Sequence, residues 1–299
     1  MFVFFTPYTY LFLSLYFIVI LFIVSINNFF MFWLFIEIVI LLFIGVSYTV
    51  FIHSYTQLIL YFLFQTLASF SILVFYIFSY KYLLFVGLFF KLGIFPFFSW
   101  YINVLYRFPS FILFLSSTLH KLPPIYIFYM ILEYQYINYI MWFCILTVLI
   151  SSVYMLYVKD LRYLIIVSSV GNNAFLLLAM LTNNIVIFIL FYGVYILNTY
   201  LILHSFGNLR AHSMSYTSSY SVFILYLFVL LLNLGSFPPM PGFFTKFLVF
   251  FTCVSLYPDL YFYFLLVMLF NVIIIVTYIL IFFKYIINVY TAPINLVIY

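Results

Sequence analysis

The sequence predicts an all-α fold, a polytopic bundle of about ten transmembrane helices. Its 299 residues are 70% hydrophobic and only 4% charged, whereas a soluble domain carries roughly 25% charged residues. Nearly the whole chain also divides into apolar pieces of about the 20 residues that a spanning helix needs. A membrane β-barrel is disfavoured, because the apolar runs show neither polar alternation nor a turn signal about every ten residues.

Each predicted helix is an apolar run that ends at a short polar or proline-containing joint. This division leaves no room for a soluble domain, so the whole of 1–299 is expected to be one membrane domain. The expected spans are 8–26, 29–51, 57–80, 82–106, 109–132, 138–158, 162–181, 184–206, 220–256 and 260–285.

The stretch 220–256 fits either one long span broken within 237–242 or two short spans. Charge favours the single broken span, because it places most basic residues on one side of the membrane together with both termini. The net charge of +5 then reflects topology rather than nucleic-acid binding. The basic side would hold Arg107, Lys159, Arg162, Arg210 and Lys284 with Asp160, and the other side Lys81, Glu133 and Asp259.

Four ionisable residues interrupt the longest apolar stretches: Glu37, Lys91, Lys121 and Lys246. A charged side chain at the bilayer centre costs about 2.5 to 3.5 kcal/mol on insertion scales, so it usually faces a protein interior or a water path and serves function. For Glu37 alone, the alternative is a carboxyl near the interface that is hydrogen-bonded to a neighbour. Its depth in a span with no other charged residue argues against that alternative.

Three of these four charges lie beside helix breakers. A proline removes an intrahelical hydrogen bond, so the freed carbonyl needs a protein or water partner at membrane depth. Broken helices are expected near 93–96 and 237–242, and broken helices of this kind mark ion sites in transporters. For any single proline the alternative is a simple kink, but three coincidences with lysine favour a shared function. Gly93 and Pro96 follow Lys91, Pro123 and Pro124 follow Lys121, and the string 237–242 (FPPMPG) precedes Lys246.

The composition also indicates where the chain is made. Phe (45) and Tyr (32) are abundant while Gly (8) is scarce, which is typical of a very AT-rich genome and predicts an organelle-encoded chain. The first helix is expected to start almost at once, with neither a basic segment nor a small-residue cleavage site before it. No signal or transit peptide is therefore expected.

Several strings resemble the antiporter-like membrane subunits of respiratory complex I, and most closely their mitochondrial subunit 2 group. The resemblance runs in order through nearly the whole chain, and the KLGxxPF and PPxxGFxxK patterns are its most specific parts. The strings are WLFIE (33–37), LILYFLFQTLASF (58–70), FKLGIFPFFSW (90–100), LHKLPP (119–124), LRYLIIVSS (161–169), GSFPPMPGFFTK (235–246) and Asn271.

The resemblance implies a proton-translocation axis through the membrane centre. Glu37 and Lys91 would form an ion pair at one end, with Lys121 as the central relay and Lys246 as the terminal site. A buried lysine whose counter-ion approaches or withdraws can take up or release a proton, which would couple one site to the next.

The chain departs from the resembled group in two ways. After Ser168 and Ser169, the position where a histidine is common holds Asn172, which orders water but does not titrate. His120 is a weaker candidate for the same path, the alternative being a histidine bonded to a free carbonyl at the break. The chain is also expected to lack the first three helices of the bacterial form and the last helix of the vertebrate form. Neighbouring subunits or lipids such as cardiolipin would then cover the surface that the missing helices leave open.

No cofactor or metal motif is present in the sequence: there is no GxGxxG, P-loop or cysteine cluster. The resemblance implies a non-redox core subunit of a proton-pumping NADH:ubiquinone oxidoreductase in the mitochondrial inner membrane, with both termini in the matrix. NADH, FMN, iron-sulfur clusters and ubiquinone would belong to partner subunits. Two alternatives remain open, a structural subunit without proton flux and a stand-alone cation/proton antiporter.

Overall fold

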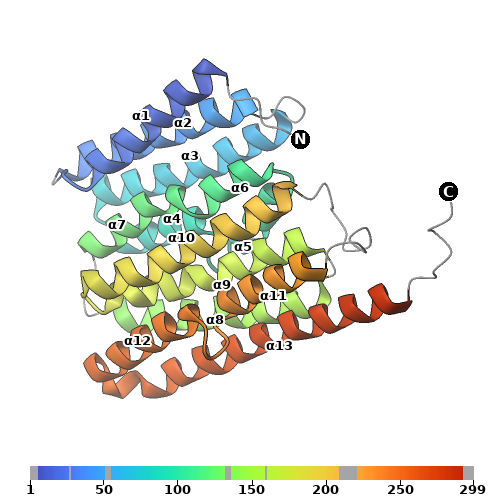
Figure 1. Cartoon of the computed structure of the whole chain (residues 1–299). Coiled ribbons are helices and arrows are strands. Elements are labelled where there is room, and N and C mark those ends of the chain that lie inside the picture. The colour runs from blue at the N-terminus through green and yellow to red at the C-terminus, as the bar shows by residue number, and fades with distance from the viewer. Residues whose placement is uncertain are drawn as a thin grey trace.

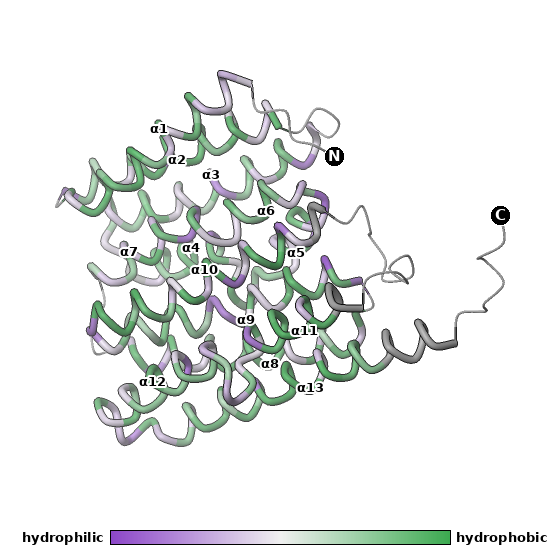
Figure 2. The backbone as a smooth tube through the Cα atoms, in the orientation of Figure 1, coloured by the Kyte–Doolittle hydropathy of each residue, from purple (hydrophilic) through white to green (hydrophobic). Residues whose placement is uncertain are grey.

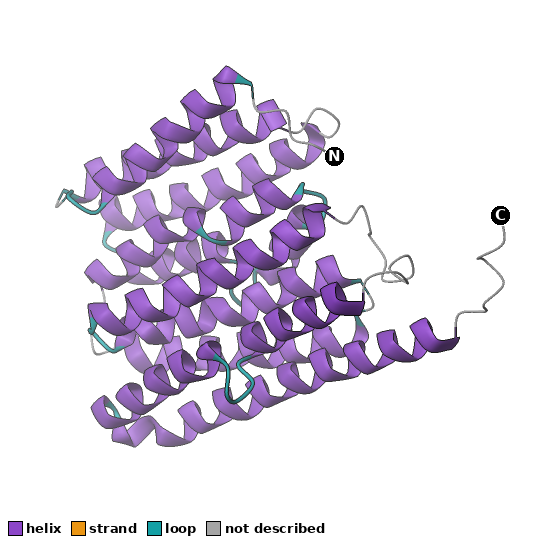
Figure 3. Ribbon diagram, in the orientation of Figure 1, coloured by secondary structure: helices purple, strands orange, loops and turns teal. Residues whose placement is uncertain are grey.

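The computed structural model describes residues 6–26, 28–50, 55–131, 136–158, 160–208 and 221–291. Within these ranges every regular element is a helix (Figure 3), which confirms the predicted all-α fold. The α-helices, labelled in Figure 1, are α1 (Pro7–Ile23), α2 (Phe29–Val50), α3 (Tyr55–Phe78), α4 (Lys81–Leu92), α5 (Phe98–Leu105), α6 (Ser110–Ser117), α7 (Leu122–Ile131), α8 (Ile137–Tyr157), α9 (Leu161–Leu181), α10 (Ile185–Asn208), α11 (Ser221–Gly235), α12 (Pro241–Leu256) and α13 (Tyr261–Thr291). Two short 3-10 helices, η1 (Leu119–Lys121) and η4 (Pro258–Leu260), precede α7 and α13.

These helices make ten crossings in the part of the chain that the structure describes. Seven helical segments are long and apolar enough to cross a membrane, and the shorter apolar helix α1, with 17 residues, makes an eighth pass through the bundle. The broken pairs α4–α5 and α11–α12 supply the remaining two. The positions of the ten crossings match the predicted spans.

The segment 220–256 is one broken span. Its halves, α11 with 15 residues and α12 with 16, are each about 22 to 24 Å long, which is short of the roughly 30 Å hydrocarbon core. Both halves pack on α10 and α13 and follow one another in the same direction across the bundle (Figure 1).

A third break lies in the span predicted at 109–132, between α6 and α7. Thr118 leaves the helical conformation with φ −116° and ψ −91°. Pro123 and Pro124 fall in the first turn of α7, where the missing N–H groups would have no intrahelical partner anyway. The prolines therefore start a new half-helix rather than kink a continuous one.

The start of α1 and the end of α13 lie at the same end of the bundle, the right-hand side of Figure 1. The turn that carries Arg107 and the start of α9, which carries Arg162, lie there too, and Tyr106 donates a hydrogen bond to Asp160 across the two turns. Asp259 lies at the opposite end, in η4. Lys159 and Arg210, expected at the basic end, and Glu133, expected at the other, are outside the described residues.

Helix α9 is the centre of the bundle, since 18 of its 21 residues are buried. Close packing against α8 requires a small residue at Gly171, where an added Cβ would lie 2.8 Å from the hydroxyl of Ser151. The outer helices instead expose large apolar side chains, as expected of a lipid-facing surface. Polar residues therefore appear as short interruptions inside a largely apolar bundle (Figure 2).

Candidate functional site: buried lysines at three helix breaks

Each buried lysine lies at one of the three helix breaks. Lys91 is in the last turn of α4, Lys121 is in η1, and Lys246 is in the second turn of α12. All three are at most 5% exposed. Gly93 ends α4 in the left-handed conformation, with φ 66°, and an added Cβ there would lie 2.6 Å from the Tyr101 ring. Only glycine suits this turn, because it combines a positive φ with a close contact.

Lys121 bridges two of the breaks through hydrogen bonds. Its ammonium donates to the side-chain oxygen of Asn173 at 2.6 Å and to the hydroxyl of Tyr195 at 3.2 Å. Asn173 in turn donates to the carbonyl of Leu92 at the end of α4. Tyr195 donates to the carbonyl of Ser117 at the end of α6. The carbonyls freed at both breaks thus have side-chain partners, as burial in a membrane protein demands.

Lys246 repeats this arrangement at the third break. Its ammonium donates to the side-chain oxygen of Asn271 at 2.8 Å. The amide nitrogen of Asn271 donates to the carbonyl of Gly235, where α11 ends, and to the hydroxyl of Ser236. The ammonium also lies 4.5 Å from the centre of the Phe175 ring, a cation–π contact. Lysine, asparagine and a freed carbonyl therefore occur in the same order at two separate breaks.

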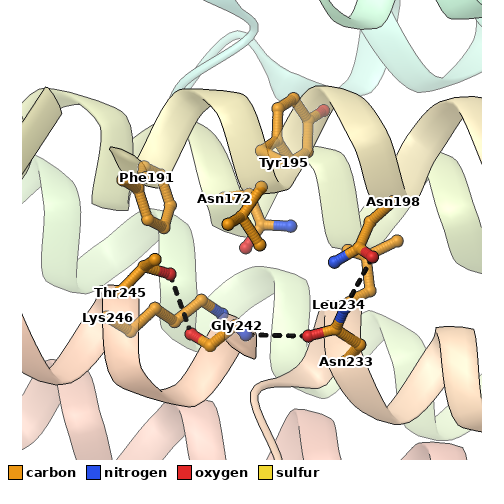
Figure 4. Close-up of a pocket in the computed structure, with 10 residues that line it drawn as sticks. Asn172, Phe191, Tyr195, Asn198, Asn233, Leu234, Gly242, Thr245 and Lys246 are labelled. Atoms are coloured by element: carbon orange, nitrogen blue, oxygen red, sulfur yellow. Dashed lines mark hydrogen bonds between the residues drawn. The ribbon is translucent and has the colours of Figure 1, made fainter. Parts of the chain in front are cut away.

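Asn233 fixes the geometry of the α11–α12 break, as Figure 4 shows. Its side-chain oxygen accepts a 2.7 Å hydrogen bond from the backbone N–H of Gly242 in the first turn of α12, and its amide nitrogen donates to Asn198. An added Cβ at Gly242 would lie 2.1 Å from the carbonyl oxygen of Asn233. Glycine is thus required for the two half-helices to approach this closely.

A small cavity of about 20 Å³ lies between Lys246 and the Lys121 network (Figure 4). This volume is enough for about one water molecule. Asn172 and Tyr195 both line it, and Tyr195 is the residue that also bonds Lys121. Polar side chains thus continue from Lys121 to Lys246. The lining residues are Asn172, Phe191, Val194, Tyr195, Asn198, Asn233, Leu234, Gly242, Thr245 and Lys246.

The ion pair that the resemblance implied between Glu37 and Lys91 is not formed in the described structure. The Lys91 ammonium is buried without a hydrogen-bond partner, although Glu37 lies within its electrostatic reach. The packing order explains this, because α3 contacts both α2, which carries Glu37, and α4, which carries Lys91. Glu37 itself is half-buried.

The weaker candidates, His120, Ser168 and Ser169, lie in different local environments. His120 turns away from the Lys121 network and packs among the rings of Tyr16, Phe43 and Tyr61, with its Nδ1 3.4 Å from the Tyr16 hydroxyl. Ser168 and Ser169 each donate to the carbonyl three residues earlier in α9. Among the described residues, no group of three or more His, Cys, Asp and Glu side chains could hold a metal ion.

Two residues of the site were not predicted from the sequence. Asn173, rather than its neighbour Asn172, is the partner of Lys121, and Tyr195 provides that lysine's second hydrogen bond. Two adjacent asparagines in an apolar run signalled that α9 faces something polar, but only the packing of α9 decides which of them meets Lys121. Tyr195 carried no signal among 32 tyrosines.

Comparison with known proteins identifies the family. The family model described as the transmembrane region of NADH:quinone oxidoreductase and Mrp antiporter subunits matches residues 76–277, which is more than half of the chain. The chain belongs to this family. The matched region of this antiporter-family chain contains all three helix breaks and all three buried lysines. No curated protein matches the chain.

Solved structures share the fold of this antiporter-family chain at low sequence identity. A chain of respiratory complex I from Thermus thermophilus, with bound aureothin, aligns with a TM-score of 0.77 at 18% identity, over 90% of this chain and 67% of that one. A chain of the Mrp complex from Dietzia sp. DQ12-45-1b aligns with a TM-score of 0.71 at 15% identity, over 85% and 56%. A chain of an archaeal membrane-bound sulfane sulfur reductase aligns with a TM-score of 0.66 at 15% identity, over 84% and 60%. The chain therefore spans 56 to 67% of the length of these matched chains.

Proposed function

We propose that this chain is a core membrane-arm subunit of a proton-pumping NADH:ubiquinone oxidoreductase of the mitochondrial subunit 2 type, and that it contributes to proton translocation. One observation carries the proposal: Lys121 and Lys246, both buried at helix breaks, are connected through Tyr195 and a cavity with room for water. Membership of the antiporter family supports it.

The proposed mechanism uses the hydrogen-bond partners of each lysine. In an apolar site, a lysine keeps its proton only while neighbouring groups stabilise the ammonium form. For Lys121 these groups are the Asn173 oxygen, the Tyr195 hydroxyl and the surrounding rings, and for Lys246 they are Asn271 and the Phe175 ring. A small shift of a half-helix would change these distances, so that one lysine releases a proton as the next takes one up.

Proton transfer between the two lysines would pass through the cavity. Asn172 does not titrate, so a water molecule between Asn172, Tyr195 and Lys246 would carry the proton there. Water bridges of this kind need only two to four polar partners, and the cavity offers them. Ser168 and Ser169 would help order water on the same helix.

The proposal includes the location and the partners of the chain. The membrane would be the mitochondrial inner membrane, with the basic end of the bundle, where α1 starts and α13 ends, in the matrix. Other membrane-arm subunits of complex I, including neighbouring antiporter-like subunits, and lipids such as cardiolipin would cover surfaces that a trimmed subunit leaves open. The chain itself would perform no redox chemistry, and NADH, FMN, iron-sulfur clusters and ubiquinone would be handled by partner subunits.

The test is to replace Lys121 and Lys246 separately by methionine in the assembled complex. Methionine keeps much of the length of lysine but removes the proton-binding group. The expected result is a lower proton-to-electron ratio for both variants. Phe247→Leu is the matched control, because Phe247 follows Lys246 but is 46% exposed on the outer face of α12. An unchanged ratio for both lysine variants would sink the pumping proposal and leave the structural-subunit alternative.

A stand-alone cation/proton antiporter is the second candidate, since a chain of an Mrp complex shares the fold. The content of intramembrane acids weighs against it, because Glu37 is the one carboxylate in the interior of the described spans, whereas Asp259 lies at the very start of its span. Cation exchange by the purified chain in vesicles, without other subunits, would favour the antiporter.

A further inference from the structure

Gln65 is an unexplained buried polar group outside the lysine networks described above. It lies in the middle of α3 and is 1% exposed, and neither its amide oxygen nor its amide nitrogen has a hydrogen-bond partner in the described structure. Leaving a buried amide unsatisfied costs about 1 to 3 kcal/mol, so such a group calls for an explanation.

The packing of α3 against α2 places Gln65 level with Glu37. One helical turn away from this level, the Trp33 indole N–H of α2 donates a hydrogen bond to the Ser69 carbonyl of α3 at 2.9 Å. Glu37 is four residues after Trp33, and Gln65 is four residues before Ser69. Because the helices run antiparallel and residues four apart share a helix face, Glu37 and Gln65 meet one turn further along.

The packing of α3 against α4 places Gln65 level with Lys91 as well. The rings of Phe64 and Phe90 are 5.8 Å apart. Because the helices are antiparallel, Gln65 and Lys91 each lie one residue from this pair in opposite directions, so their depths differ by only about 3 Å. An added Cβ at Gly87, one turn before Lys91, would lie 2.7 Å from the Ala68 carbonyl, which confirms the close antiparallel contact. Gln65 therefore lies on the helix between the two charges, and the Lys91 ammonium has no hydrogen-bond partner in the described structure.

We propose that Gln65 is the positioning residue that connects Lys91 to Glu37. The amide oxygen accepts a hydrogen bond from the Lys91 ammonium, and the amide nitrogen donates one to the Glu37 carboxylate. The same order of lysine, amide and acceptor is seen at Lys121 with Asn173 and at Lys246 with Asn271. In those two cases the final acceptor is a backbone carbonyl, whereas here it is an ionisable carboxylate.

The ionisable acceptor distinguishes the Lys91 site from the Lys121 and Lys246 sites. Two hydrogen bonds of about 2.9 Å and the width of the amide let Gln65 join charges that are too far apart for a direct ion pair. A rotation of the glutamine side chain makes or breaks the link without moving a helix. Resting on the proposed function, the inference is that Gln65 controls when Glu37 stabilises the Lys91 ammonium.

A map of the assembled wild-type complex that resolves side-chain amides tests the link independently of pumping. Support would be a Gln65 oxygen within about 3.2 Å of the Lys91 ammonium and a Gln65 nitrogen equally close to the Glu37 carboxylate. A Gln65 amide bonded elsewhere, or a direct ion pair between Glu37 and Lys91, would overturn the inference. Neither outcome depends on whether the chain pumps protons.

The functional test compares Gln65→Met with Lys91→Met by the proton-to-electron ratio of the complex. Gln65→Met is expected to lower the ratio as far as Lys91→Met does, and the double variant should be no worse than either, because Gln65 acts through Lys91. Gln57→Met is the matched control, since Gln57 is a second buried glutamine two turns away on α3. A normal ratio for Gln65→Met beside a lowered ratio for Lys91→Met would overturn the Gln65 inference and leave the proposed function standing.

Discussion

The ammonium of Lys121 and the side-chain oxygen of Asn173 are 2.6 Å apart, and this contact ties two broken helices together. Asn173 holds the carbonyl at the end of α4, while Lys121 lies in the break between α6 and α7. A change in the charge of Lys121 would therefore alter the hydrogen bond to the carbonyl of Leu92, the residue next to Lys91. Such a link between neighbouring breaks is a physical basis for coupling between sites.

Tyr195→Phe should weaken the Lys121 network while leaving the ring in place. The hydroxyl accepts from Lys121 and donates to the Ser117 carbonyl, so its loss strips both buried groups of a partner. We expect a loss of about 1 to 3 kcal/mol in the stability of the complex and a lower proton-to-electron ratio. Thermal unfolding and proton pumping of the purified complex would measure the two effects.

Tyr192→Phe is the matched control for Tyr195→Phe. Tyr192 is one turn earlier on α10 and is also buried, but its hydroxyl has no hydrogen-bond partner in the described structure. Removing an unpartnered buried hydroxyl should leave stability unchanged or raise it. Equal losses for the two variants would contradict the role given to Tyr195.

Asn271→Leu and Lys246→Met should not be additive. The two side chains share a 2.8 Å hydrogen bond, and Asn271 also holds the Gly235 carbonyl at the break. In a double-mutant cycle of thermal stability, contacting residues show coupling of about 0.5 to 3 kcal/mol. Additive losses would mean that the lysine and the asparagine act separately.

The sequence was sufficient to predict the spans and two of the three breaks, because long apolar runs, glycine and proline act locally. The burial of Lys91, Lys121 and Lys246 followed from the same patterns. The partners of the lysines did not follow, since the choice between Asn172 and Asn173 depends on the rotation of α9 in the bundle. The implied ion pair between Glu37 and Lys91 is not a direct contact in this structure, where helix α3 packs against both of their helices.

Gly242→Ala should destabilise the break between α11 and α12. The added Cβ would lie 2.1 Å from a backbone oxygen of Asn233, which cannot move aside as a flexible side chain would. We expect a cost of about 2 kcal/mol or more from this overpacking, measured by thermal unfolding of the complex. The proton-to-electron ratio of the complex should fall as well, because α12 carries Lys246 just after Gly242.

Gly193→Ala is the matched control for Gly242→Ala. Gly193 is within helix α10, and an added Cβ there meets nothing within 4 Å. Since alanine favours a helix interior by about 1 kcal/mol over glycine, stability should stay the same or increase. A comparable loss at Gly193 would show that the sensitivity at 242 reflects glycine replacement in general rather than the tight break.

Asn172→Leu should block proton passage between Lys121 and Lys246. The asparagine lines the cavity of about 20 Å³ that Tyr195 and Lys246 share, and leucine would replace its polar group by an apolar one in a space suited to a single water molecule. The expected result is a proton-to-electron ratio as low as that of Lys246→Met, together with the loss of ordered water at this position in a map of the complex.

Asn172→Ala separates the role of water from that of the amide. Alanine removes the amide but enlarges the cavity between Tyr195 and Lys246, so that water keeps its access to both polar groups. The ratio should then stay near that of the wild type, and Asn172→His should also preserve it, because an imidazole can pass a proton directly. If alanine lowered the ratio as much as leucine, the amide of Asn172, and not the water beside it, would be the required link.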